Sequence, residues 1–184
     1  MYRAFAWSCL QRGVDVNLPE AVAGVLRDWN ATFECVEGQV RILVDGYYPE
    51  KEIRTAETSA AVSPIAAVPE VRAWMKEAQR GFVRFGNLVM EGRDIGTNIF
   101  PETPFKFYLE ASPAERERRR AAEGVRDNLA ARDQRDSTRA VAPLKKAEGA
   151  SVIDNSGESL QETSGRILAR IQRQMAERAE RKRD

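Results

Sequence analysis

Asn87-Leu-Val-Met-Glu91 is followed directly by Gly92-Arg-Asp-Ile-Gly-Thr97, and these eleven residues decide the expected fold. The first five form a short apolar run without polar alternation, which is typical of a β-strand covered on both faces. A glycine after such a strand lets the backbone approach a ligand, and here an arginine and an acid follow it. Taken alone, the second segment is equally typical of a strand-terminating turn with a local Arg–Asp pair.

Two further apolar runs, Phe105–Leu109 and the weaker Ser151–Asp154, predict more strands of the same kind. Helical patterns are expected over 112–120, 124–139 and the C-terminal stretch from Glu158. Strands separated by helices indicate an α/β fold with a parallel sheet, in which ligands gather at the carboxyl ends of the strands.

The N-terminal half has a different organisation. A helix is expected over the first ten or so residues, and a second from Pro19 to about Asn30. Alternating residues over 32–44, with a turn at Gly38, predict a β-hairpin. Two short helical segments broken by Pro64 and Pro69 follow.

Composition limits the class of protein. The 184 residues fit one domain, and 42% hydrophobic with 31% charged residues are typical of a soluble globular chain. No apolar stretch approaches the roughly 20 residues that a bilayer requires, and the N-terminus lacks the pattern of an export signal. Cys9 and Cys35 form no disulfide framework, so we expect a cytoplasmic protein. We also expect a monomer that binds no membrane.

The chain contains no histidine. This excludes Ser–His and Cys–His nucleophile pairs and removes the commonest transition-metal ligand, so we expect no protein-built metal site. Chemistry must depend on carboxylates, arginine, lysine and backbone groups. Phosphoryl transfer suits that set, because its transition state needs cationic groups and a metal rather than a strong base.

Arginines concentrate in a few segments. The run Arg132-Asp-Gln-Arg-Asp136-Ser-Thr-Arg139-Ala-Val-Ala-Pro-Leu144 places arginines at near-helical spacing, and 116–120 holds four more. Each segment alone is also typical of a solvated, ion-paired helix face, and a GC-rich genome would raise the arginine total. Together with Arg3 and Arg72, they suggest a polyanionic nucleotide ligand, whereas the formal charge of +1 argues against nucleic acid.

At this point the sequence resembles a known family. Gly92–Thr97 with Phe100-Pro101, and the arginine run from Arg132 to Leu144, resemble bacterial cytidylate kinase. The resemblance also includes Met1-Tyr-Arg3, Glu52-Ile-Arg-Thr55, the segment from Ser63 to Arg72, and Val152-Ile-Asp154. The hairpin between Phe33 and Val44 is similar to the family's enlarged monophosphate-binding insert, which favours CMP over AMP.

The resemblance implies a P-loop NTPase-type parallel sheet with flanking helices in one domain over 1–184, with a CMP-binding insert at about 29–68 and a lid at about 116–139. It implies transfer of the ATP γ-phosphate to CMP or dCMP, with Mg²⁺. The implied substrate-binding residues are Ser63, Arg72 and Asp94 around the cytosine, Arg3 and Arg93 on the CMP phosphate, and Arg132 and Asp136 on the pentose. Arg139 would face the transferring phosphate, so the expected catalytic set is Arg139, Arg93 and Arg132.

Two departures from the family pattern matter. The printed sequence contains no Gly-x-x-x-x-Gly-Lys loop, so we expect the first strand, P-loop and helix to be missing, the ATP-binding residues to be unassigned, and the chain in isolation to be inactive. The lid is also shorter than in longer family members. A truncated, non-catalytic regulatory module that binds CMP without ATP is therefore the alternative, and an arginine-rich RNA-binding protein fits least well.

Overall fold

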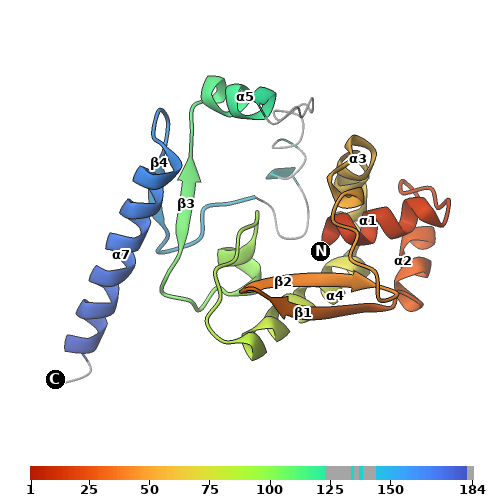
Figure 1. Cartoon of the computed structure of the whole chain (residues 1–184), viewed down its shortest axis with the longest axis horizontal. Helices are drawn as coiled ribbons and strands as arrows, with labels where there is room; N and C mark the ends of the chain where they lie inside the picture. Colours follow the sequence, from red (N-terminus) through yellow and green to blue (C-terminus); the bar gives the residue numbers. More distant parts are fainter. Residues whose placement is uncertain (123–133, 135–136, 139–143, 182–184) are drawn as a thin grey trace. The chain divides into compact units, whose positions relative to one another are not determined.

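The computed structural model describes residues 1–122, 134, 137–138 and 144–181 (Figure 1). They belong to two compact units. Unit 1 contains residues 1–93 and 126–144, and unit 2 contains residues 94–125 and 145–184. The sequence-based boundaries of the insert and of the lid stay predictions.

Unit 1 is built from helices and one β-hairpin. Its elements are α1 (Tyr2–Gln11), α2 (Pro19–Arg27), β1 (Ala31–Val36), β2 (Gln39–Val44), the 3₁₀ turn η1 (Glu52–Arg54), α3 (Ala56–Ile65), α4 (Pro69–Arg80) and the 3₁₀ turn η2 (Gly81–Phe85). The predicted N-terminal helices are confirmed. Pro69 begins α4 as expected, whereas Pro64 lies inside the last turn of α3 rather than breaking it.

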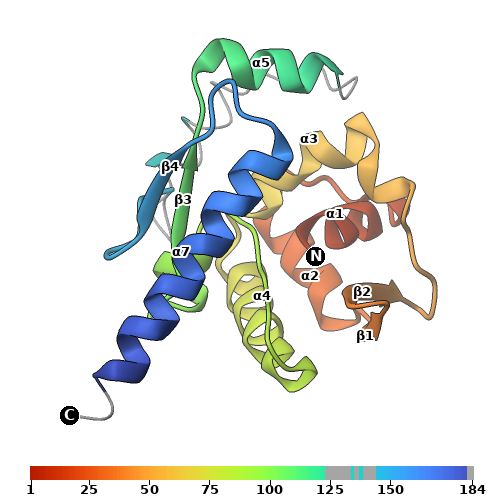
Figure 2. The same ribbon diagram turned by 60° about the vertical axis from the view of Figure 1, so that its left-hand side comes forward.

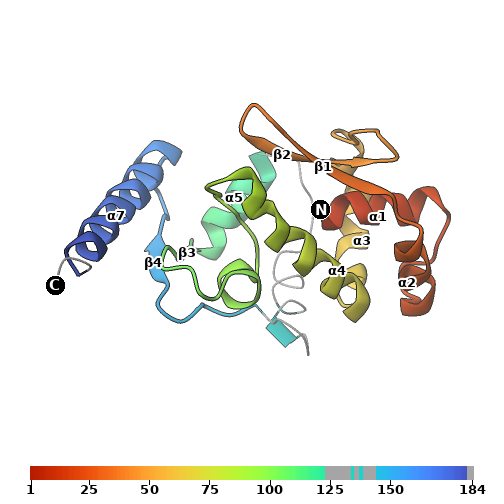
Figure 3. The same cartoon turned by 90° about the horizontal axis from the view of Figure 1, so that it is seen from below.

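The predicted hairpin is also confirmed (Figure 3). Strands β1 and β2 pair antiparallel from Ala31 opposite Val44 to Val36 opposite Gln39. The two connecting residues, Glu37 and Gly38, have φ angles of 51° and 75°. Positive φ at both positions is what a two-residue turn requires if its twist is to match that of the strands.

Aromatic packing organises the core of unit 1. Phe5 of α1 is fully buried and meets Trp29 edge-on, with ring centroids 4.8 Å apart. Trp29 contacts Trp74 of α4, and its indole N–H donates to the Ser8 hydroxyl at 2.9 Å. Phe33 of β1 packs on Trp74 as well, so the hairpin is attached to the helical core.

Unit 2 contains a parallel strand pair. Its elements are the π-helical turn η3 (Ile95–Ile99), β3 (Phe107–Glu110), α5 (Pro113–Ala122), β4 (Ser151–Asp154) and α7 (Leu160–Glu180). β3 and β4 pair in parallel from Phe107 beside Ser151 to Glu110 beside Asp154 (Figure 2). These elements confirm the α/β prediction for this part of the chain.

The expected strand at Asn87–Glu91 is wrong. The described residues form only the β1–β2 and β3–β4 sheets, neither of which includes this run, and Val89 is fully exposed. Leu109 and Val152 are 52% and 43% exposed, so β3 and β4 are not covered on both faces as expected. An apolar run becomes a buried strand only when other segments pair with it and cover it, and the run itself does not encode those partners.

Within the part of the chain that the structure describes, no helix combines the length and apolar character that crossing a membrane requires. The expected helix over 124–139 lies mostly outside the described residues.

Candidate functional site

Arg3 is anchored in unit 1 by two neutral acceptors. Its Nη1 donates to the Ile53 carbonyl at 2.9 Å and to the Ser59 hydroxyl at 2.7 Å. Arg3 lies on the first turn of α1, Ile53 in η1 and Ser59 on α3. Two separate elements, η1 and α3, therefore hold the guanidinium of a residue on α1, and Arg3 is half-buried.

The junction between η1 and α3 holds these acceptors in place. Thr55 is the N-cap of α3, and its hydroxyl oxygen accepts from the Thr58 N–H at 3.2 Å. The Thr58 hydroxyl donates to the Glu52 carbonyl at 2.9 Å, and the Thr58 side chain is buried. The segment Glu52–Thr55, which the resemblance singled out, thus builds the support for Arg3.

Ser63 and Arg72 lie on neighbouring helices of the same unit. Ser63 follows Ser59 by one helical turn on α3 and lines a cavity of about 680 Å³. The cavity's other lining residues are Leu10, Val16, Asn17, Glu57, Ala60, Ala61, Pro64, Ala67 and Thr138. Arg72 does not line it. Arg72 is only 5% exposed on α4, where its Nη1 donates to the Ala66 carbonyl at 3.2 Å.

Glu91 approaches the start of α1. The pKa of the Met1 amino group is lowered to about 6, mainly by burial and also by the charge of Arg3, while the charge of Glu91 opposes that shift. Arg3 and Glu91 therefore lie within electrostatic reach of the same group. Arg93, two residues after Glu91, is half-buried at the end of this segment of unit 1.

Asp94 begins the π-helical turn in unit 2. Its carbonyl accepts from the Asn98 N–H at 2.9 Å, and its Oδ2 accepts from Nδ2 of Asn98 at 3.2 Å. A Cβ atom on Gly96 would lie 3.2 Å from Cβ of Ala147 and 3.2 Å from Cδ of Lys106. A methyl group at the second glycine of the Gly92–Thr97 segment would therefore require its neighbours to shift by a few tenths of an ångström.

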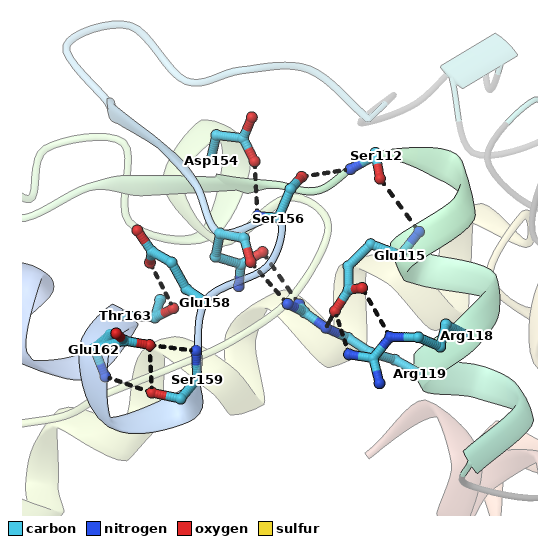
Figure 4. A network of polar contacts seen from close by, with 11 residues as sticks. Ser112, Glu115, Arg118, Arg119, Asp154, Ser156, Glu158, Ser159, Glu162 and Thr163 are labelled. Atoms are coloured by element: carbon cyan, nitrogen blue, oxygen red, sulfur yellow. Dashed lines mark hydrogen bonds and ion pairs between the residues drawn. The ribbon is translucent and has the colours of Figure 1, made fainter.

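A network of polar side chains surrounds the carboxyl ends of β3 and β4 (Figure 4). Arg119 donates to the Asn155 carbonyl at 2.8 Å and to Oδ1 of Asn155 at 3.1 Å. The Ser112 N–H donates to the Ser156 hydroxyl at 2.8 Å. These bonds join α5 to the loop after β4, where a parallel sheet presents ligand-binding groups.

Glu115 lies between two arginines of α5 in that network (Figure 4). Arg118 donates to both Glu115 oxygens, at 2.9 and 2.7 Å, and Nε of Arg119 donates at 2.7 Å. Hydrogen bonds from Arg118 and then Arg119 lower the pKa of Glu115 to about 2. The carboxylate therefore stays ionised under ordinary conditions and neutralises part of the arginine charge.

The loop after β4 is fixed by its own hydrogen bonds. Oδ1 of Asp154 accepts from the Ser156 N–H at 2.8 Å, and the bonds from Ser156 lower the pKa of Asp154. Ser159 and Glu162 form a reciprocal capping box at the start of α7. Arg166 of α7 forms an ion pair with Glu158.

The predicted site residues divide into three groups. Arg3, Ser63, Arg72 and Arg93 lie in unit 1, and Asp94 lies in unit 2. Arg132, Asp136 and Arg139 lie outside the described residues.

Sequence reasoning missed two features of the site. One is Ser59 as a partner of Arg3, and the other is the bond from Arg119 to Asn155. The position of Ser59, one helical turn before Ser63, was the available signal for the first.

Comparison with known proteins gives a consistent result. The family model described as cytidylate kinase matches residues 1–173. The cytidylate kinase of Limosilactobacillus fermentum is 34% identical over 190 residues, covering 97% of this chain and 84% of the relative. The cytidylate kinase of Anoxybacillus flavithermus is 39% identical, covering 94% and 81%. A bifunctional pantoate ligase/cytidylate kinase of Synechococcus sp. (strain RCC307) is 39% identical, covering 92% of this chain and 36% of that longer protein.

Proposed function

The chain belongs to the cytidylate kinase family, and we propose on that basis that it transfers the γ-phosphate of ATP to CMP or dCMP. The products are CDP or dCDP and ADP. The observation that carries this proposal is the extent of the family match, because residues 1–173 include segments of both compact units. A chain that shared only a nucleotide-binding fragment would match over a shorter stretch.

In the proposed reaction an oxygen of the CMP 5′-phosphate attacks the γ-phosphorus of ATP. A new P–O bond forms to CMP as the bond to the ADP β-phosphate oxygen breaks. We propose that Arg3 and Arg93 hold the CMP phosphate. A guanidinium stays protonated and can offer paired N–H donors to phosphate oxygens, and the described contacts of Arg3 fix the plane of that group in advance.

Ser63, Arg72 and Asp94 are proposed to recognise the cytosine. A carboxylate such as that of Asp94 can accept a hydrogen bond from the exocyclic amine of cytosine, which uracil lacks. Its bond from Nδ2 of Asn98 supports this role, because that bond orients the carboxylate without neutralising it. Ser63 supports it through its place at the wall of the cavity in unit 1.

Three proposed residues lie outside the described part of the chain. Arg132 and Asp136 are assigned to the pentose and Arg139 to the transferring phosphate, all by family resemblance. Residues 29–68 are proposed as the CMP-binding insert and 116–139 as the lid. In this family assignment the arginines would stabilise the charge that moves with the γ-phosphoryl group.

ATP is the proposed phosphate donor, with Mg²⁺ bound to its phosphates. Residues 1–122, 134, 137–138 and 144–181 contain no cluster of three or more acidic, histidine or cysteine side chains suited to a metal ion. Mg²⁺ in kinases is held largely by substrate phosphates and water, so its ligands need not come from such a cluster. The described residues therefore have no assigned magnesium ligand.

The test is CMP-dependent production of ADP from ATP and Mg²⁺, measured on the printed chain and on the longest in-frame product of its gene. We expect turnover with CMP and dCMP and much weaker turnover with UMP and AMP. Equal rates with all four acceptors would contradict the assigned specificity. CMP binding measured by calorimetry without ADP production in either form would favour the non-catalytic module instead.

A further inference from the structure

We propose that Ser59 is a positioning residue for the acceptor nucleotide, acting through Arg3. The inference rests on the proposed function, in which Arg3 holds the CMP phosphate. Ser59 itself is not expected to touch the nucleotide. Its role is to fix the guanidinium that does, together with the backbone carbonyl of Ile53.

The first step concerns the donors of Arg3. A guanidinium nitrogen of the Nη type carries two hydrogens. Nη1 of Arg3 reaches two acceptors, the Ile53 carbonyl at 2.9 Å and the Ser59 hydroxyl oxygen at 2.7 Å. Because the guanidinium is planar, bonds from one nitrogen to acceptors on two elements set the orientation of the whole group.

The second step concerns the hydroxyl of Ser59. A serine hydroxyl has one proton to donate and two lone pairs to accept with. The Ser59 hydroxyl donates to the Thr55 carbonyl at 2.8 Å. Its only proton is therefore directed back along α3, and its oxygen presents a lone pair to Arg3.

The third step concerns the stability of that arrangement. The Thr55 side chain caps α3, and its hydroxyl also donates to the hydroxyl oxygen of buried Thr58 at 2.9 Å. Thr58 in turn bonds the Glu52 carbonyl. Ser59 thus lies in the first turn of α3, where Thr55 and Thr58 are already hydrogen-bonded. It can therefore orient Arg3 before a nucleotide binds.

Preorganisation of this kind strengthens binding, because less side-chain freedom is lost when the phosphate binds. The opposite effect is physically possible. If a bound phosphate had to pull Arg3 away from Ser59, removal of the hydroxyl would tighten CMP binding. The two mechanisms predict changes of opposite sign in the affinity for CMP.

The experiment compares Ser59→Ala with wild type in steady-state kinetics and in calorimetric binding of CMP. We expect KM and Kd for CMP to rise about fivefold to tenfold, as for loss of one ordinary intramolecular hydrogen bond. The KM for ATP and kcat should change less than twofold. A general folding defect would lower the active fraction and would not move the CMP parameters alone.

Three further variants make the test specific. Ser59→Thr keeps a hydroxyl at this position and should restore most of the CMP affinity. Ser164→Ala removes an exposed helical serine of α7 and should change nothing. In an Arg3→Ala background, Ser59→Ala should have no further effect, because the residue through which it acts is gone.

Each outcome is decisive. Unchanged or tighter CMP binding in Ser59→Ala, or an equal effect with and without Arg3, would overturn the inference while leaving the kinase proposal intact. Wild-type protein that neither binds nor phosphorylates CMP would overturn the proposed function, and this inference with it.

Discussion

Arg3 in unit 1 and Arg119 in unit 2 both donate to protein acceptors, which include two neutral groups at Arg3 and a carboxylate at Arg119. Nη1 of Arg3 meets a backbone carbonyl and a serine hydroxyl, both neutral. Arg119 meets Asn155 and also the carboxylate of Glu115, which it shares with Arg118. Neutral acceptors orient a guanidinium without cancelling its charge, whereas a carboxylate cancels part of it.

The difference separates two uses of arginine that look alike in sequence. An arginine oriented by neutral groups suits the binding of an anion, because its positive charge still acts on the ligand. An arginine paired with a carboxylate suits the joining of two elements, here α5 and the loop after β4. Substitutions in unit 1 and in unit 2 test the packing and the charges that support these arginines and the neighbouring site residues.

The largest effect is expected from Phe5→Ala, which removes a buried side chain from α1, the helix that also carries Arg3. Phe5 is fully buried on α1 and packs against Trp29. Loss of a buried aromatic side chain typically costs about 3–5 kcal/mol in the free energy of unfolding. Urea unfolding followed by tryptophan fluorescence measures it, since all three tryptophans, Trp7, Trp29 and Trp74, lie in unit 1.

The control for that variant is Val83→Ala. Val83 is 59% exposed on η2, so the free energy of unfolding should stay within about 0.5 kcal/mol of wild type. If Phe5→Ala unfolded at the same urea concentration as this control, the buried aromatic cluster would not be what stabilises unit 1.

The next effect is expected in substrate selection rather than stability. Asp94→Asn replaces a pure acceptor with a group that also donates, so the preference for CMP over UMP should fall about tenfold or more. The measurement is the ratio of kcat/KM for the two nucleotides. Asp28→Asn, an exposed change after α2, is the matched control. An unchanged ratio in Asp94→Asn would remove Asp94 from base recognition.

Local signals account for what the sequence predicted correctly. The hairpin was predictable because alternation over β1 and β2 and the Glu37-Gly38 turn are properties of adjacent residues. The helices and the strands β3 and β4 were predictable for the same reason. The family resemblance added proposed roles for the arginines, which periodicity alone left ambiguous and which stay predictions.

What failed or was missed depends on distant contacts. The run Asn87–Glu91 has strand composition, but pairing is decided by other segments, and the structure leaves Val89 exposed. Arg3 and Ser59 are 56 positions apart, so no local pattern links them. The chain shows where arginines occur, whereas only the fold shows whether a hydroxyl or a carboxylate meets each one.

A smaller, pH-dependent effect is expected from Glu115→Gln. The two arginines lower the pKa of Glu115 from 4.5 to about 2. The ionised form therefore stabilises the folded state fully above pH 4.5, and this contribution is lost as the pH falls toward 2. Thermal unfolding of wild type and Glu115→Gln should differ most above pH 4.5 and converge on acidification.

Glu117→Gln is the control for the carboxylate on the same helix. Glu117 is exposed on α5, so its variant should run parallel to wild type across the same pH range. Added salt should shrink the Glu115 difference, since exposed ion pairs are screened. A Glu115 difference that did not depend on pH would mean that the side chain acts by packing and not by charge.

The smallest effect is expected from alanine substitution at two glycines of unit 2, Gly96 and Gly165, which should change the free energy of unfolding in opposite directions. Gly96→Ala would place a methyl group 3.2 Å from Cβ of Ala147, which is buried, and from Lys106, whose Nζ is bonded to the Pro101 carbonyl at 2.9 Å. We expect a loss below about 1 kcal/mol in the free energy of unfolding, because the neighbours need to shift by only a few tenths of an ångström.

Gly165→Ala makes the same chemical change in α7, where a Cβ would meet no atom within 4 Å. Alanine is favoured over glycine inside a helix by about 0.5–1 kcal/mol, so this variant should be more stable than wild type. Opposite shifts in the unfolding midpoint would show that close packing disfavours a methyl group at Gly96 but not at Gly165. If both substitutions raised the free energy of unfolding, Gly96 would not be packed as tightly against Ala147 and Lys106 as the structure indicates.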